Sequence, residues 1–165
     1  AILVTDSKAL AAAVARLIPE LAERLPEPRR SFVADVFAGY GGIIHTATME
    51  AACEVVNEFA PEHLQIQSAE PFSYLRRIKN AGEILLGANV PFSAANYVAG
   101  PNAVLPTGGA AKTYSPVSVR DFLKFSSVVY ATAEGYESMK PHVIALAEYE
   151  GFFAHANAFK LRTRP

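Results

Sequence analysis

The sequence predicts an α/β protein with a mostly parallel sheet and helices on both of its faces. Over residues 1–88, short apolar runs rich in β-branched residues alternate with longer stretches of helical periodicity. This repeated strand-helix-strand order is typical of parallel strands joined by crossover helices. Beyond residue 114 the pattern is mainly helical, so we expect a helical tail to follow the sheet.

The composition limits the classes of protein to which the chain can belong. Its 165 residues fit one ordinary domain, and 51% of them are apolar, which is enough for a substantial core. The net charge is −1 and the basic residues form no long run, unlike those of a nucleic-acid-binding protein. No apolar run approaches the ~20 residues that span a membrane. We therefore expect neither nucleic acid nor a membrane as a partner.

Cysteine content and the first residue bear on the setting of the protein. Cys53 is the only cysteine, so an internal disulfide is impossible and a reducing, cytoplasmic location is expected. The chain begins at Ala1, directly in an apolar run. This start indicates a cut through a larger protein, with a removed tag or a processed methionine as the alternative.

Two strands and two helices are predicted before residue 47. Residues 1–5 form a buried strand, and residues 6–25 form a helix that Asp6 or Ser7 caps. Pro19 is expected to bend or divide this helix. The rest of this part should hold a short helix from residue 32, a glycine turn at residues 39–42, and a strand at Ile43 and Ile44.

The next predicted helix ends just before a short alternating stretch. Residues 48–60 carry apolar side chains at four-residue spacing, and Pro61 ends that helix near Ala60 because residues before proline avoid helical angles. Leu64 and Ile66 alternate with glutamines, the period of a half-buried strand. A third helix over residues 68–82 and a strand over residues 83–87 complete the pattern.

Residues 89–116 are rich in proline and glycine and have almost no periodicity. Such a stretch is either a linker or a functional loop, and its mixture of apolar anchors with Asn96, Tyr97 and Asn102 favours the functional loop. After it, Ser118 and Asp121 predict a helix start by their capping-box spacing. A strand over residues 126–132 and one long amphipathic helix over residues 137–162, with Pro141 in its first turn, should follow.

The segment FAPEHLQIQ (residues 59–67) places a carboxylate and an imidazole side by side after a proline. Histidine is the usual general base in proteins, so His63 is suited to that role, while Glu62 can tune it or activate water. At the start of a strand, both side chains can reach a crevice at the edge of an open sheet. On the residues alone, the alternative of a solvated helix end stays open.

The other histidines give weaker signals. His45 and His142 fit structural or solvated positions, and His155 lies five residues after Glu150 on a loosely neighbouring helix face. The sequence contains no G-x-G-x-x-G after a strand, no P-loop and no G-x-S-x-G. It therefore predicts no self-contained cofactor site.

Four blocks, in order through essentially the whole chain, resemble histidinol dehydrogenase: VNEFAPEHLQIQ, AGEILLG, NYVAGPNAVLPTGGAAKTYSPVSVRDFLKF and AEYEGFFAHANAF. The resemblance is to the C-terminal part of the family. It implies a zinc-dependent homodimer that oxidises L-histidinol to L-histidine in two NAD-linked steps through an aldehyde. It also implies a Rossmann-like α/β half-domain over residues 1–114 and a tail domain over residues 115–165 that is swapped between subunits.

The resemblance also assigns roles to single residues. His63 would be the general base, and Glu62 would activate the water that attacks the aldehyde. Glu150 and His155 match tail positions that reach the partner subunit's site, where Glu150 would contact substrate and His155 would bind zinc.

Two positions depart from the family pattern. Asn96 stands where the family has a zinc-binding aspartate, and a neutral amide is a poorer zinc ligand than a carboxylate. Ala103 stands where the family has a substrate-contacting histidine. The remaining zinc ligands, a glutamine and a histidine, and most of the cofactor-binding half are expected upstream of Ala1. The isolated chain is therefore expected to be inactive, either as a piece of an enzyme or as a degenerate, non-catalytic homologue that serves as a dimerisation or binding module. An α/β interaction domain without this ancestry is a third, weaker alternative.

Overall fold

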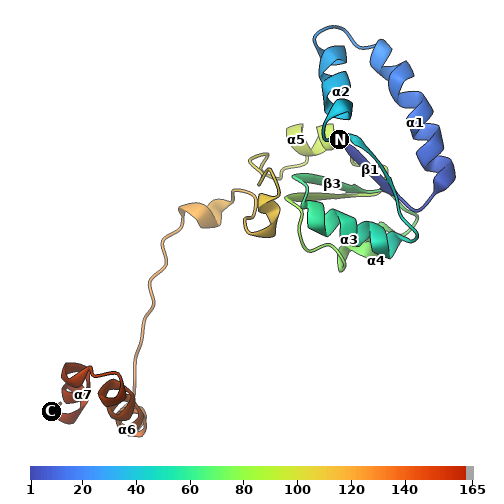
Figure 1. Ribbon diagram of the computed structural model, residues 1–165. Helices are drawn as coiled ribbons and strands as arrows, with labels where there is room; N and C mark the ends of the chain where they lie inside the picture. Colours follow the sequence, from blue (N-terminus) through green and yellow to red (C-terminus); the bar gives the residue numbers. More distant parts are fainter. Residues whose placement is uncertain (163–165) are drawn as a thin grey trace. The chain divides into compact units, whose positions relative to one another are not determined.

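The first of the two units into which the chain divides contains four short strands, with helices between and after them (Figure 1). In the computed structural model, which describes residues 1–162, the first unit covers residues 1–122 and the second begins at Leu123. The strands are β1 (Ile2–Thr5), β2 (Gly42–His45), β3 (His63–Ile66) and β4 (Glu83–Leu86). The protein is therefore of the mixed α/β class.

All strand pairing in the described residues is parallel, as the sequence predicts, but it forms two sheets. β1 pairs with β2, in a register that sets Ile2 beside Gly42, and β3 pairs with β4, in a register that sets His63 beside Glu83. The expectation of one continuous hydrogen-bonded sheet is therefore wrong for residues 1–162. An apolar run predicts that a strand forms, but it carries no information about which pairs join.

A helical hairpin connects β1 to β2. Helix α1 (Lys8–Glu23) begins at Ser7, whose Oγ accepts a hydrogen bond from the Leu10 amide at 3.2 Å. It continues through Pro19 as a single helix, so the expected division there does not occur. Helix α2 (Arg29–Ala38) starts earlier than predicted.

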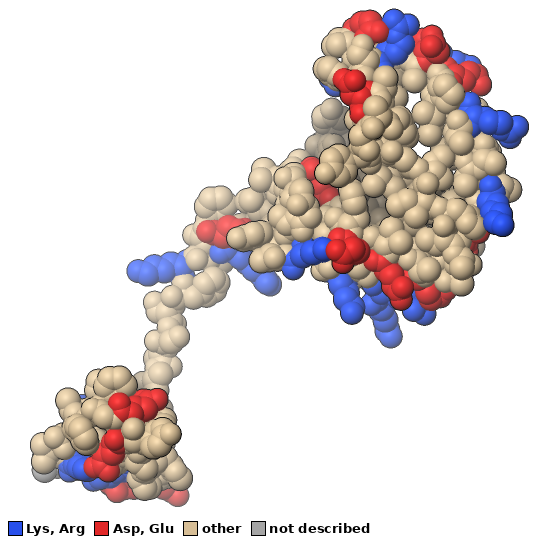
Figure 2. Space-filling model, viewed as in Figure 1, with Lys and Arg blue, Asp and Glu red and all other residues tan. Residues whose placement is uncertain are grey.

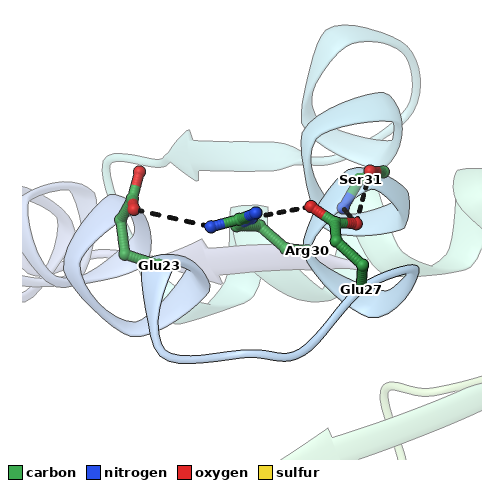
Figure 3. Close-up of polar contacts among 4 residues, drawn as sticks. All are labelled: Glu23, Glu27, Arg30 and Ser31. Atoms are coloured by element: carbon green, nitrogen blue, oxygen red, sulfur yellow. Dashed lines mark hydrogen bonds and ion pairs between the residues drawn. The ribbon is translucent and has the colours of Figure 1, made fainter.

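The turn between α1 and α2 is held by side chains close in sequence (Figure 3). Glu27 accepts hydrogen bonds from Arg30 Nε at 2.7 Å and from Ser31 Oγ at 2.6 Å, while Arg30 Nη1 lies 4.0 Å from Glu23. All of these contacts are on the surface. Neither helix, each lying wholly within the described residues, contains a buried residue.

Helix α3 (Met49–Phe59) supplies much of the small core of the first unit. Its Ala52 and Cys53 are only 4% and 6% exposed, and burial raises the pKa of the Cys53 thiol. α1 and α3 both pack against β1, and Figure 1 shows them on opposite sides of that strand. The helix ends at Ala60, where the chain enters the left-handed region (φ 52°, ψ 65°).

Helix α4 (Pro71–Leu75) stops well short of the helix predicted to Gly82. The reason is a set of hydrogen bonds from the side chain of Asn57, on α3. Its Oδ1 accepts from the amides of Lys79 at 2.6 Å and Asn80 at 3.2 Å, and its Nδ2 donates to the Arg77 carbonyl at 2.7 Å. These bonds take the backbone groups that a longer helix would pair within itself.

The segment predicted to be without regular structure contains two short helices. α5 (Phe92–Tyr97) and the 3-10 turn η1 (Ala110–Lys112) lie within it. The capping box at Ser118 forms, with its amide donating to Asp121 Oδ2 at 2.6 Å. It starts only the 3-10 turn η2 (Val119–Phe122), not the predicted helix.

The strand predicted over residues 126–132 is absent from the structure, and that prediction is wrong. This segment is extended, and its Val128, Val129 and Tyr130 are 91%, 90% and 86% exposed. A β-branched run favours extended backbone, but a strand also needs a neighbour to pair with its amides and carbonyls. In the described residues no neighbour pairs with it.

The second unit contains two helices where one was predicted. α6 (Ala133–Tyr149) and α7 (Phe153–Lys160) are separated at Gly151, whose φ of 77° ends helical geometry. Pro141 is inside α6 and not in its first turn, and His142 follows it on an exposed position. The hydroxyl of Tyr136 donates to the Phe159 carbonyl at 2.8 Å, which ties α6 to α7.

Charged side chains of both signs gather along the rim of the first unit and leave a broad face with few charges (Figure 2). Among residues 1–162, no helix combines the length and the apolar character that crossing a membrane requires.

Candidate active site

Glu62 and His63 meet at the point where α3 gives way to β3. The left-handed Ala60 and the following proline turn the chain, so Glu62 lies just outside the strand and His63 is its first residue. The side chains of a regular strand alternate between faces, but this irregular entry lets both turn to one side. His63 Nδ1 lies 3.6 Å from Glu62 Oε1, so the structure brings the predicted pair together.

The pair lies at the amino-terminal edge of the β3–β4 sheet. The amides of Gly82 and Glu83 donate to the carbonyls of Pro61 and Glu62, each at 2.9 Å, and fix the two strand starts side by side. A Cβ atom on Gly82 would lie 2.6 Å from the Glu62 carbonyl oxygen, so this close approach requires glycine. Ligands of open α/β sheets generally bind at the carboxyl ends of the strands, so the position of this pair does not follow that rule.

Glu83 is a member of this cluster that the sequence analysis missed. It lies beside His63 in the parallel register, and its Oε2 is 3.7 Å from His63 Nε2. The side chain is only 10% exposed, and its Oε2 has no hydrogen-bond partner among the described residues. The sequence feature that could have identified Glu83 is its position as a lone charged residue at the start of the apolar strand EILLG, the next strand after the P-E-H-L block.

Helix α5 covers the imidazole. Asn96 Oδ1 lies 3.2 Å from His63 Nε2, and the Phe92 ring meets the imidazole edge-on, with centroids 5.6 Å apart. Gln65, two residues along β3 and so on the same face as His63, donates from Nε2 to the carbonyls of Gly87 and Val90. These bonds fix the loop from which α5 starts.

A hollow of about 1220 Å³ opens beside the cluster, with Glu62, His63 and Asn96 on its wall. Most of the other lining residues are apolar, and they come from β1, β2 and β3, from α1 and α3, and from the loops between them. Its volume exceeds the ~300–1,000 Å³ of a typical small-molecule site. Glu83 is not part of the wall, so it supports the imidazole from behind and does not face the hollow directly.

The remaining predicted site residues lie elsewhere along the chain. Ala103 is exposed, in a turn where Asn102 Oδ1 accepts from the Val104 amide at 2.7 Å. Glu150 caps the end of α6, and His155 lies in the first turn of α7, its ring stacked 5.5 Å from Phe152. They therefore belong to different helices of the second unit and not to neighbouring faces of one helix.

The residues present do not fit a zinc ion by themselves. Within residues 1–162, no group of three or more histidine, cysteine, aspartate or glutamate side chains is placed to bind a metal. A catalytic zinc usually takes three protein ligands, and the oxygen of Asn96 is already directed at His63. The turn from β1 into α1 likewise lacks the glycine-rich loop that would cradle the phosphates of NAD.

Comparison with known proteins gives consistent matches. The family model described as histidinol dehydrogenase matches residues 1–163. A histidinol dehydrogenase homolog of Colwellia psychrerythraea is 53% identical over 159 residues, which cover 96% of this chain and 36% of that protein. A histidinol dehydrogenase of Synechocystis sp. is 49% identical over 162 residues, or 98% of this chain and 37% of that protein. The chain thus spans about a third of the length of these relatives.

The fold agrees with these matches. The crystal structure of histidinol dehydrogenase from Elizabethkingia anophelis superimposes with a TM-score of 0.89 and 29% identity, covering 97% of this chain and 36% of that one. The family match, the two relatives and the shared fold lead to one conclusion. The chain belongs to the histidinol dehydrogenase family.

Proposed function

We propose that this chain is the C-terminal part of an NAD-linked, zinc-dependent dehydrogenase that oxidises an amino alcohol, such as L-histidinol, through an aldehyde to the acid. The observation that carries the proposal is the contact between His63 and Glu62, 3.6 Å apart on the wall of the hollow. A base and a carboxylate at one point suit a reaction that removes protons twice, first from an alcohol and then from water.

The chain's own residues are assigned proton transfer alone. In the first oxidation, His63 takes the hydroxyl proton while the carbon gives up its hydride, for which NAD would be the acceptor. In the second, Glu62 takes a proton from the water that adds to the aldehyde, and the resulting hydrate loses a hydride to become the acid. Zinc and NAD would require groups beyond those that residues 1–162 bring together, and His155 and Asn96 are the positions of this chain proposed to lie near zinc.

The remaining architecture follows as part of the same proposal. Residues 1–114 would be part of a Rossmann-like domain in the cytoplasm, and residues 115–165 a tail exchanged between the subunits of a homodimer. The exposed apolar side chains of the extended segment before α6, such as Val128 and Val129, support an assembled state in which they are covered. Glu150 would contact substrate from that tail, and Ala103 would mark a contact that the family's histidine makes and this protein lacks.

A second candidate is a degenerate homologue that has kept a dimerising or binding surface and lost catalysis. Two observations favour it: Asn96 replaces a carboxylate and bonds to His63 instead, and Ala103 leaves an exposed turn without a titratable group. The two candidates differ in whether His63 still exchanges a proton with substrate.

The test is an NADH-formation assay on the protein at the length of its relatives, supplied with zinc, NAD and L-histidinol. The enzyme proposal expects turnover that falls by about 10²–10⁴-fold in His63→Asn, the range for loss of a general base. Glu62→Gln should spare oxidation of the alcohol more than oxidation of the aldehyde. Equal turnover in wild type and His63→Asn would contradict the assigned base, and no turnover with any amino alcohol would favour the degenerate homologue.

A further inference from the structure

The imidazole of His63 is surrounded by oxygen atoms at both of its nitrogens. Nε2 faces Asn96 Oδ1 at 3.2 Å and Glu83 Oε2 at 3.7 Å, and Nδ1 faces Glu62 Oε1 at 3.6 Å. We propose that Glu83 is a positioning residue that fixes the neutral imidazole of His63 in the tautomer with its proton on Nε2. Nδ1 then remains the unprotonated nitrogen, on the side of Glu62.

Glu83 decides the tautomer because an ionised carboxylate can only accept hydrogen bonds. The side-chain amide of Asn96 has both a donor and an acceptor and can present either of them by rotating, so Asn96 by itself is compatible with a proton on either nitrogen. A lone pair on Nε2 would face the Glu83 carboxylate with no proton between them. A proton on Nε2 removes that conflict, whereas the Glu62 carboxylate at Nδ1 is 41% exposed and can accept hydrogen bonds from water instead.

The burial of Glu83 favours a proton on Nε2. The side chain of Glu83 is only 10% exposed, and its Oε2 has no other hydrogen-bond partner among the described residues. A buried acceptor without a donor is unfavourable, and a proton on Nε2 is the nearest donor that can relieve it. A shift of the imidazole toward Glu83 would bring the 3.7 Å separation into hydrogen-bond range.

The surroundings restrict rotation of the imidazole. The ring of Phe92 stands at 83° to it, and Gln65 holds the loop that carries α5. The backbone bond between Glu83 and Glu62 keeps the two strand starts in register. If His63 is the base of the proposed function, on which this consequence rests, Nδ1 is the nitrogen that receives the substrate's proton, beside the water-activating Glu62.

The test is nitrogen-15 NMR of the histidine rings in the 165-residue chain at pH 9, where an unperturbed imidazole is neutral. His63→Gln assigns the signal among the four histidines. We expect a pyrrole-type, protonated Nε2 and a pyridine-type, unprotonated Nδ1. A protonated Nδ1 in the wild-type chain, alone or together with Nε2, would overturn the proposal without any further variant.

Three variants separate Glu83 from its neighbours. Glu83→Gln keeps the shape but adds an amide donor, so the ratio of the Nε2–H to the Nδ1–H tautomer should fall by about tenfold. Asn96→Leu and Glu62→Gln leave the Glu83 carboxylate in place and should keep the proton on Nε2. A tautomer that changes in Asn96→Leu but not in Glu83→Gln would assign the positioning role to Asn96 and refute the proposal.

This measurement is independent of turnover. If the protein at the length of its relatives had no dehydrogenase activity, the proposed function would be wrong, but the measured tautomer of His63 would still stand. If the protein were active and the proton were on Nδ1, the positioning role of Glu83 would be wrong, but the proposed dehydrogenase function would still stand.

Discussion

The β3–β4 region and the α1–α2 hairpin are held together by different kinds of contact. Around β3 and β4, single polar side chains bind backbone groups far away in the sequence, as Asn57 does with residues 77–80 and Gln65 with Gly87 and Val90. In the hairpin, the ion pairs and side-chain bonds join residues at most seven positions apart, all on the surface. The long-range bonds around β3 and β4 fix remote elements relative to one another. The short-range contacts in the hairpin stabilise only a local turn.

The difference follows the placement of the candidate site. Three oxygen atoms from different parts of the chain lie around the His63 imidazole, so we expect its surroundings to tolerate little movement. The hairpin carries no predicted site residue, and its helices have no buried side chain among the described residues. The same kind of substitution should therefore change the free energy of unfolding more in the β3–β4 region than in the hairpin.

The largest contrast is expected between two glycines at strand starts. In Gly82→Ala, the new methyl group would lie 2.6 Å from the Glu62 carbonyl and 3.1 Å from Pro106, so the backbone must move, at a cost of about 3 kcal/mol. In Gly42→Ala, at the start of β2, no atom lies within 4 Å of the new methyl group, and stability should change by under ~1 kcal/mol. Urea unfolding followed by far-UV circular dichroism measures both, and equal midpoints would mean that the close approach at Gly82 does not restrict the residue there.

Asn57→Ala should rank next. It removes three hydrogen bonds and leaves two amides and one carbonyl of residues 77–80 to find water, which we expect to cost about 2 kcal/mol because the side chain is half-buried. Faster hydrogen exchange at the amides of Lys79 and Asn80 would show that the loss is local. The control is Arg24→Ala, which breaks the exposed pair with Glu20 and should change stability by under ~1 kcal/mol. A control as costly as Asn57→Ala would contradict the comparison.

A smaller effect, of about 1 kcal/mol, is expected from coupling between positions 83 and 96. Asn96→Asp would place a second carboxylate at the nitrogen that already faces the buried Glu83, and two like charges there repel. The same substitution in a Glu83→Gln background should be nearly neutral, because the buried charge is then absent. A double-mutant cycle at pH 9 measures the difference. A coupling energy near zero would mean that the two side chains do not share one site.

Local signals in the sequence predicted local structure well. Ser7 was one of two candidates for the cap of α1, and Pro61 correctly placed the end of α3 at Ala60. The P-E-H-L block correctly placed Glu62 beside His63, although the catalytic roles of the pair remain predictions. Each of these features depends on residues within one or two turns of each other, where spacing alone carries the physical information.

The sequence failed where a distant partner decides the outcome. The third predicted helix shortens to Pro71–Leu75 because Asn57, on another helix, binds the backbone beyond it. The strand predicted before α6 has the right residues for extended backbone but no strand beside it in the described chain. Glu83 was overlooked because its importance arises from the parallel register that sets it beside His63, and periodicity does not reveal register.

The smallest effect belongs to the hairpin, and it tests whether local bonds there have any measurable consequence. The hydrogen bond from the Ser31 hydroxyl, and then the one from Arg30, hold the pKa of Glu27 below its ordinary value. A carboxyl whose pKa is lowered by folding adds stability above its unfolded pKa and loses that contribution as the pH falls through its folded pKa. Ser31→Ala should therefore raise the pKa of Glu27, and more than Arg30→Gln does, in a carbon-13 NMR titration. Because the Glu27 side chain lies on the surface and is 49% exposed, salt should weaken the Arg30 contribution while the stability of the whole chain hardly changes. An unchanged Glu27 pKa in Ser31→Ala would mean that the hydroxyl bond does not persist in solution.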